Sequence, residues 1–193
     1  MEQNFLQKYK TIIIILGLVV IVSGWLVSKH NYFVRQNEAI DNQWAQVENQ
    51  FQRRFDLIPN IVSTVKGIAN QEQAVFGQIA DARARYSGAS TVDEKAVAAG
   101  QVESALARLL VITENYPTLQ SSASFRDLTV SLEGTENRIS VERMKYNDLV
   151  KDLNQNVKVF PASIAASIFG VKEHAYFEIA SGVENTPKVD FSQ

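Results

Sequence analysis

The chain contains no cysteine, and this absence excludes several kinds of chemistry. Without thiols the protein cannot form a disulfide, hold an iron–sulfur cluster, bind zinc through thiolates or use a cysteine nucleophile. It has only two histidines, His30 and His174, and neither follows a carboxylate by three residues. Both fall outside the regions where we expect the core, so histidine-based metal sites, a di-iron centre and a Ser-His-acid triad all lack their central component.

Two further absences narrow the function. The nine glycines are scattered and no Gly-Lys-Ser or Gly-Lys-Thr occurs, so the sequence contains no phosphate-binding loop. Lysine and arginine together number 19 against 21 aspartates and glutamates, so the chain offers no basic field for nucleic acid. We therefore expect a protein that is not an enzyme, carries no metal or other cofactor, and binds no nucleic acid.

What the sequence does contain is a long uncharged segment close to the N-terminus. Residues 11–28 are eighteen consecutive residues without charge, and most of them are Ile, Leu or Val. As a helix they would cover about 27 Å, which is close to the hydrocarbon thickness of a bilayer. Tyr9 and Trp25 stand where aromatic rings favour the two membrane interfaces. The segment therefore predicts a single transmembrane helix, with residues 1–30 forming a short tail and the anchor.

A cleaved secretory signal is the alternative explanation of this segment. Such a signal needs a shorter apolar run and small residues at the cleavage site, whereas residues 23–25 are Ser-Gly-Trp. Lys8 and Lys10 precede the span and Lys29 and Arg35 follow it, so the positive-inside count is nearly tied. The slight bias, together with a short basic tail typical of a signal anchor, predicts a retained anchor and a domain outside the cytoplasm.

Beyond the anchor, apolar residues recur at steps of three and four, which is the period of a helix. One such stripe covers residues 40–86 without losing its phase. Pro59 lies inside it, where a proline removes a backbone donor and disfavours helical geometry in the preceding residue. Asp56 is well placed to cap a new helix that would hold Pro59 in its first turn. We therefore predict two helices, over 36–56 and 57–86.

Two more helices are expected after a turn. Residues 87–91 form this turn by composition, and Thr91 or Asp93 can cap the helix that follows. That third helix is expected to end before Pro117. The longest regular stripe covers residues 125–157 and predicts the fourth helix.

The C-terminal part is predicted to be less regular. The fourth helix is expected to stop at Phe160 and Pro161, and a short apolar piece follows over 164–171. Residues 182–193 read as a polar, loose tail. No strand alternation persists anywhere in the sequence. The pattern predicts an all-α protein in which a single N-terminal transmembrane helix precedes a bundle of long helices, spanning residues 31–181.

Polar residues interrupt the stripes at three positions where an apolar residue is expected: Glu72, Thr135 and Glu142. Further polar residues surround the last two: Glu136, Arg138, Arg143 and Asn147. One explanation is a carboxylate–arginine network inside the bundle, because a buried charge is costly unless it is paired. The other is that the stripe rotates there and leaves these side chains at a solvated edge. A buried layer of this kind more often fixes helix register than performs chemistry.

One motif is more specific than these patterns. It reads Arg53-Arg54-Phe55-Asp56-Leu57-Ile58-Pro59-Asn60-Ile61-Val62 and continues through Thr64-Val65-Lys66-Gly67. In this motif we expect one of the two arginines to pair with a carboxylate of the last helix and the other to stay solvated. The alternative is that both are surface charges.

Together with matches elsewhere, this motif closely resembles the LemA family of bacterial membrane-anchored proteins. The resemblance runs from about Asn31 to Glu178 and keeps order and spacing. The further matching residues are Trp44, Ala82-Arg83, Glu114-Asn115-Tyr116-Pro117, Phe125, Thr135-Glu136-Asn137-Arg138-Ile139, Arg143, Tyr146-Asn147, Asn154, Phe160-Pro161 and Tyr176-Phe177-Glu178. One departure is Asn70-Gln71-Glu72, where the family pattern implies a histidine before the glutamate, and this weakens any metal role there. We regard the matched positions, with Glu72 and Glu142, as structural motif residues.

The resemblance implies an N-terminal anchor followed by an antiparallel up-and-down four-helix bundle with long helices, and it implies little biochemistry. Family members look like envelope proteins, and some lie in genomic company with a membrane zinc protease or small secreted-domain partners. We therefore expect a single-pass protein of the bacterial inner membrane that acts as a scaffold, assembling with copies of itself or docking other envelope proteins. An adaptor or regulator of a membrane protease is the alternative, and a hydrolase is a remote one.

Surplus apolar residues at both ends of the bundle suggest where self-association would occur. The candidate contacts between subunits are Tyr32, Phe33, Ile164, Ile168, Phe169, Tyr176 and Phe177. Large apolar patches on a monomer commonly mark contacts with a partner or a membrane. Two alternatives stay open: the C-terminal segment folds back against its own bundle, or the aromatic residues beside the anchor sit among lipid headgroups.

Overall fold

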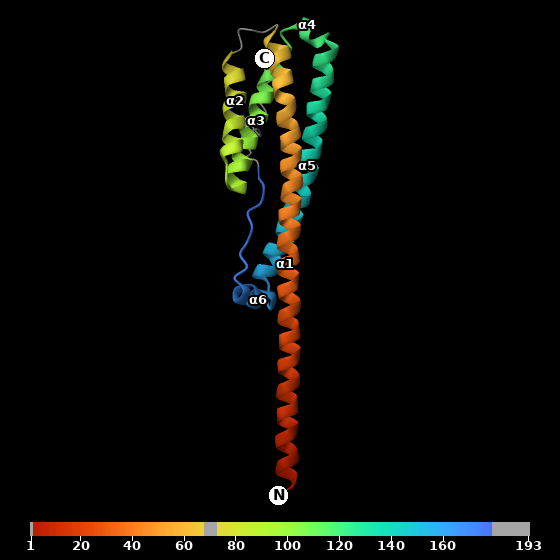
Figure 1. Cartoon of the computed structure of the whole chain (residues 1–193), viewed down its shortest axis with the longest axis vertical. Helices are drawn as coiled ribbons and strands as arrows, with labels where there is room; N and C mark the ends of the chain where they lie inside the picture. The colour runs from red at the N-terminus through yellow and green to blue at the C-terminus, as the bar shows by residue number, and fades with distance from the viewer. Residues whose placement is uncertain (1, 68–72, 179–193) are drawn as a thin grey trace, which may run out of the picture. The chain divides into compact units, whose positions relative to one another are not determined.

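The structure, a computed structural model, describes residues 2–67 and 73–178, with side chains from residue 9 onward. Two expectations fall outside these residues, namely the place of Glu72 in its stripe and the loose tail at 182–193. The helices are α1 Glu2–Lys66, α2 Gln73–Gly88, α3 Val92–Thr113, α4 Pro117–Gln120, α5 Ala123–Lys158 and α6 Ala162–Phe169 (Figure 1). No strand occurs in the described part of the chain, so the predicted all-α class is confirmed.

The chain divides into two compact units, which we describe separately. The first unit comprises Met1–Asn42 and Asp148–His174, and the second comprises Gln43–Asn147 and Ala175–Gln193. Both α1 and α5 therefore contribute residues to each unit. The short helix α6 belongs to the first unit, whereas α2, α3 and α4 belong to the second.

The predicted helix junction at Asp56 and Pro59 is wrong, because α1 continues through both residues to Lys66. Asp56 lies inside the helix, where its Oδ1 accepts a hydrogen bond from the amide of Gln52 one turn earlier, at 2.8 Å. The next helix, α2, is described from Gln73 to Gly88. The break in the predicted 57–86 helix therefore comes after Lys66.

Burial of one continuous face explains why α1 passes Pro59. A proline in a helix interior costs about 3 kcal/mol. Phe55 and Ile58 before it and Ile61 and Val65 after it are at most 4% exposed, whereas Pro59 itself is on the solvent side. Fully burying side chains of this size contributes about 1.5–3 kcal/mol each. The shared apolar face therefore outweighs the loss of one backbone hydrogen bond.

The start of α3 is set by a local signal that the sequence shows clearly. Of the two predicted caps, Thr91 and Asp93, the structure shows Thr91: its Oγ1 accepts a hydrogen bond from the backbone N–H of Glu94 at 3.2 Å. The Glu94 carboxylate in turn accepts the backbone N–H groups of Ser90, at 2.8 Å, and Thr91, at 3.2 Å. These backbone hydrogen bonds lower the pKa of Glu94. Such a reciprocal capping box satisfies donors that every helix start leaves unpaired.

The later helices end close to where the sequence predicts. Helix α3 stops at Thr113, before Pro117, which opens the single turn of α4. Helix α5 ends at Lys158, just before Phe160 and Pro161, and α6 then occupies most of the expected apolar piece. The left-handed Gly170 terminates α6, a position that glycine adopts without steric penalty.

Each unit has its own core. In the second unit α2 packs against α3. An aromatic cluster joins α2 to α1. The ring of Tyr86 lies 5.0 Å from Phe51 and 4.9 Å from Phe55, measured between centroids. In the first unit, buried side chains come from α1, α5 and α6: Phe33, Ile40, Val150, Leu153 and Ala165.

Helix α1 also carries an apolar surface that the protein leaves uncovered. Residues 11–24 are all exposed, and the helix from Tyr9 onward, which contains them, is long and apolar enough to cross a membrane by length and composition. Helix α3 passes the same test, but it buries Val102, Leu106 and Leu109 in the second unit, as the core helix of a soluble domain does. The candidate span is therefore the N-terminal part of α1.

Candidate functional site

An ion pair links α1 to α5 inside the second unit. Arg54 on α1 pairs with Glu136 on α5, and the two side chains are 8% and 33% exposed. The neighbouring Arg53 is exposed. The expectation that one arginine pairs with the last helix while the other stays solvated is therefore confirmed, although no helix begins there.

Two more charged residues complete this layer. Burial raises the pKa of the Glu103 carboxyl on α3, and the nearby Glu136 raises it further, while Arg54 and Arg143 oppose both effects. Burial lowers the pKa of Arg143 on α5, and the same two glutamates oppose that change. The layer thus contains two glutamates and two arginines from three helices. We call these four residues the charged layer.

Sequence reasoning missed Glu103, although the signal was present. Glu103 follows the buried Ala99 by four residues and precedes the buried Leu106 by three, so it lies on the core-facing side of α3. Glutamate in such a register is the same kind of exception as the polar positions noted on the last helix. The sequence signal for Glu103 is therefore its position in the helical register of α3.

The positive and negative side chains of the charged layer neutralise one another. Its formal charges sum to zero, and each member has opposite charges nearby. The Nε atoms of Arg54 and Arg143 are buried without a hydrogen-bond partner among the described residues. Within the described part of the chain, no group of three or more His, Cys, Asp or Glu residues could hold a metal ion. Opposite charges that come from three helices favour one register of those helices over others.

The C-terminal segment is bound beside this layer. The side-chain amide of Asn147 donates to the carbonyl of Phe177 at 3.2 Å, and its oxygen accepts the backbone N–H of Phe177 at 2.8 Å. The hydroxyl of Tyr146 donates to the carbonyl of Ala175 at 3.1 Å. The guanidinium of Arg143 lies 5.1 Å from the centroid of the Phe177 ring. One turn of α5 therefore binds both the backbone and the ring of this segment.

A second asparagine clamp lies in the first unit. Asn154 donates from its amide to the carbonyl of His174 at 2.9 Å and accepts the backbone N–H of the same residue at 2.9 Å. The imidazole Nε2 of His174 lies 3.1 Å from the Oδ1 of Asn37 on α1. The non-helical segment after α6 is thus bound through its backbone at both residue 174 and residue 177.

Aromatic rings surround the clamp that Asn147 forms with Phe177. The ring of Trp44 lies 5.3 Å from Tyr146 and 5.6 Å from Phe177, measured between centroids. Lys95, which pairs with Glu48, places its ammonium 5.7 Å from the centre of the Trp44 ring. The motif residues of α1 and α5 therefore meet around the C-terminal segment.

Comparison with known proteins identifies the family. A model of the LemA family matches residues 43–191, which is more than half of the chain. The chain belongs to the LemA family. This confirms the resemblance drawn from the motif residues.

Relatives of this LemA-family chain include magnetosome proteins. MamQ 1 and MamQ 2 of Paramagnetospirillum magneticum are each 27% identical to it over 193 residues, covering 86% of this chain and 71% of theirs. MamQ of Magnetospirillum gryphiswaldense is 28% identical over 189 residues, covering 84% of this chain and 69% of its own length.

The remaining motif residues of the LemA-family chain do not join the charged layer. Those exposed to solvent are Arg53, Asp56, Pro59, Asn60, Glu114, Pro117, Arg138, Phe160 and Pro161. Tyr116 is half-buried, and Thr135 is buried with its hydroxyl donating to the carbonyl of Leu132 at 2.7 Å. The polar positions of the last helix are therefore buried in part and solvated in part, so each of the two explanations holds for some of them.

Glu142 is half-buried, between the buried and the exposed polar positions of the last helix. Its Oε2 accepts a hydrogen bond from the Gln43 amide at 2.6 Å, and its Oε1 pairs with Lys145 at 2.9 Å. These interactions lower the pKa of Glu142, with the Gln43 hydrogen bond as the largest cause. Glu142 thus ties α5 to α1 from the edge of the second unit.

Two of the expected subunit contacts are core residues of this chain. Phe33 and Phe177 are each 1% exposed, so neither can meet a second copy. Phe177 is buried because the C-terminal segment folds back onto its own helices, which was one of the two alternatives. Of the other five, Tyr32 is half-buried, and the exposed ones are Ile164, Ile168, Phe169 and Tyr176.

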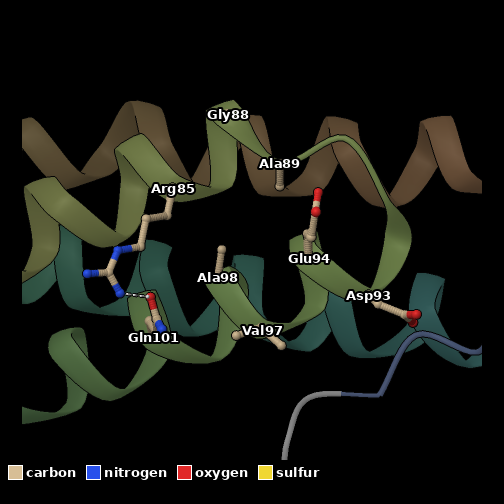
Figure 2. Close-up of a pocket in the computed structure, with 8 residues that line it drawn as sticks. All are labelled: Arg85, Gly88, Ala89, Asp93, Glu94, Val97, Ala98 and Gln101. Carbon is tan, nitrogen blue, oxygen red and sulfur yellow. Dashed lines mark hydrogen bonds between the residues drawn. The ribbon is translucent and has the colours of Figure 1, made fainter.

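A pocket on the second unit is a rival candidate site. It lies between α2 and α3 and is lined by residues that Figure 2 shows: Arg85, Gly88, Ala89, Asp93, Glu94, Val97, Ala98 and Gln101. Arg85 donates to Gln101 at 3.0 Å across it, and Glu94 belongs to the capping box of α3. Arg85, Gln101 and Glu94 are therefore engaged in structural bonds, and the pocket carries no proposed function.

Proposed function

We propose that this LemA-family protein is a non-enzymatic scaffold of the cell envelope, anchored in a membrane by the N-terminal part of α1. The observation that carries the proposal is that residues 11–24 are uncharged and all exposed, so they need an apolar solvent. Within the second unit, the charged side chains of the charged layer pair with one another. Such a molecule can hold a rigid helical surface at a membrane for copies of itself or other envelope proteins.

Two finer features belong to this proposal. The packing of α2 on α3 and the ion pair between α1 and α5 support an antiparallel up-and-down four-helix arrangement of the second unit. The nearly balanced charge flanks of the span support, by a small margin, a helical domain outside the cytoplasm of a bacterial inner membrane.

Topology can be tested because the chain has no cysteine background. A Ser87→Cys variant places one thiol at an exposed position of α2. We expect a membrane-impermeant maleimide to label it in cells whose outer membrane alone is permeabilised. A cysteine-free parent gives the background. Labelling that requires lysis of the inner membrane would place the domain in the cytoplasm instead.

The scaffold role predicts assembly of the full-length protein. Purified in mild detergent with the anchor intact, it should run as a discrete oligomer, or with another envelope protein in fixed ratio, when its mass is measured by light scattering with the detergent subtracted. A membrane protease in fixed ratio would favour the adaptor hypothesis. A monodisperse monomer at high protein concentration would contradict the scaffold role.

A further inference from the structure

One apolar surface of the first unit stands out on α6 and the turn before it. Val159, Phe160, Ile164 and Ile168 are between 49% and 76% exposed, and we call these four residues the α6 patch. Residues 159–169 contain no charge. Single exposed apolar residues are normal, but a cluster of large ones without any charge marks a surface that meets another apolar phase.

The geometry of α6 separates this face from its core face. Ile164 and Ile168 are four residues apart, so they share one side of the helix. Ala162, Ala165 and Ala166 are buried on the other side. Small residues face the protein and large ones face outward, which is the reverse of what a soluble surface helix requires.

The α6 patch lies beside the point where α1 leaves its apolar run. The rings of His30 on α1 and Phe169 on α6 have centroids 4.7 Å apart. Asn156, near the end of α5, accepts a hydrogen bond from Lys29 at 3.3 Å and donates one to Tyr32 at 2.9 Å. All of these contacts fall within the first unit, and they begin one residue after the uncharged segment ends at residue 28.

The exposure of α1 changes at the same level. Every residue from 11 to 24 is exposed, and Trp25 is the first half-buried residue of the apolar run. Tryptophan at the end of a span favours the interface between hydrocarbon and headgroups. Protein therefore begins to cover α1 where a bilayer that holds residues 11–24 would end.

We propose that the α6 patch sits in the headgroup region of the same bilayer that α1 crosses, as an interfacial membrane contact. This inference rests on the proposed anchor. A short apolar helix with aromatic and aliphatic side chains inserts its outward face at the headgroup–acyl boundary. The exposed Lys172, three residues after the end of α6, supplies an ammonium group of the kind that binds lipid phosphates. Ile164 and Ile168, which the sequence suggested as subunit contacts, thereby contact lipid.

The test uses single cysteines in the otherwise cysteine-free full-length protein. Ile168→Cys and Ile164→Cys, each carrying an environment-sensitive fluorophore, report on the patch in nanodiscs of equimolar phosphatidylcholine and phosphatidylglycerol. Two matched positions on α1 set the scale. Val20→Cys lies in the exposed apolar run, and Asp41→Cys is exposed about 20 Å further along the helix than residue 28. Quenching is measured with nitroxide lipids labelled near the headgroup and, separately, with aqueous iodide.

We expect the labels at 164 and 168 to be quenched several-fold more by the nitroxide lipids than the label at 41, and several-fold less by iodide. Strong iodide quenching without lipid quenching would place the patch in water and overturn the inference. Protection from both quenchers would mean that a second copy or another segment covers it, which overturns the inference as well. If the label at 20 also escapes the nitroxide lipids, the anchor proposal itself has failed, so the two failures are distinguishable.

Discussion

Replacing Phe177 with alanine should lower the free energy of unfolding by about 3 kcal/mol, as is usual when a buried aromatic ring is removed from a core. The ring is 1% exposed, lies against Trp44 and Phe51, and receives the guanidinium of Arg143. Chemical denaturation of the full-length protein in detergent, followed by circular dichroism, measures the loss.

The matched control for this prediction is the next residue along the chain. Tyr176 is 38% exposed, and Tyr176→Ala should change stability by no more than about 0.5 kcal/mol. The two positions also separate core packing from self-association. An oligomer that dissociates in Phe177→Ala without any loss of stability would restore Phe177 as a subunit contact.

Substituting Arg54 with methionine should destabilise the second unit by about 2–3 kcal/mol, because removal of one partner leaves a partly buried carboxylate without its counter-charge. Glu136 loses its ion pair, and Glu103 loses a positive charge that lowers its pKa. Arg53→Met, at the exposed neighbouring position, is the control and should stay within about 0.5 kcal/mol.

The pH dependence identifies the cause of the Arg54→Met effect. In the folded variant the pKa of Glu103 should rise further above its value in the unfolded chain. A carboxyl whose pKa is raised by folding destabilises the folded state above that pKa, and the penalty disappears as the pH falls below the unfolded value. The difference from the parent should therefore shrink in acid. A difference that is constant with pH would indicate lost packing instead of lost charge.

The parts of this fold that the sequence predicts are those with local causes. Thr91 and Glu94 cap α3 through atoms three residues apart, and the periodic face of α5 follows from helix geometry. Pro59 shows the limit, because its local preference is overruled by the burial of a face that continues beyond it. A stripe also shows which side of a helix is buried without showing what lies against it.

In the candidate site, too, some features have local causes in the sequence and others depend on tertiary packing. The pairing of one arginine of the motif with the last helix could be anticipated, since a buried guanidinium needs a carboxylate. Two features depend on how the helices pack together. One is that Glu136 is the partner, and the other is that Glu103 of a third helix joins the layer. Phe177 carries no periodic signal at all, because it lies in a non-helical segment whose neighbours in space are far away in sequence.

The asparagine clamps determine which substitutions the segment after α6 can accept in evolution. Asn154 and Asn147 bind the peptide groups of residues 174 and 177, and a peptide group is present whatever the side chain. Exposed positions such as Ala175 can therefore drift in evolution while the segment keeps its course. The exception is proline at either clamped position, which has no N–H to donate and would release one half of the clamp.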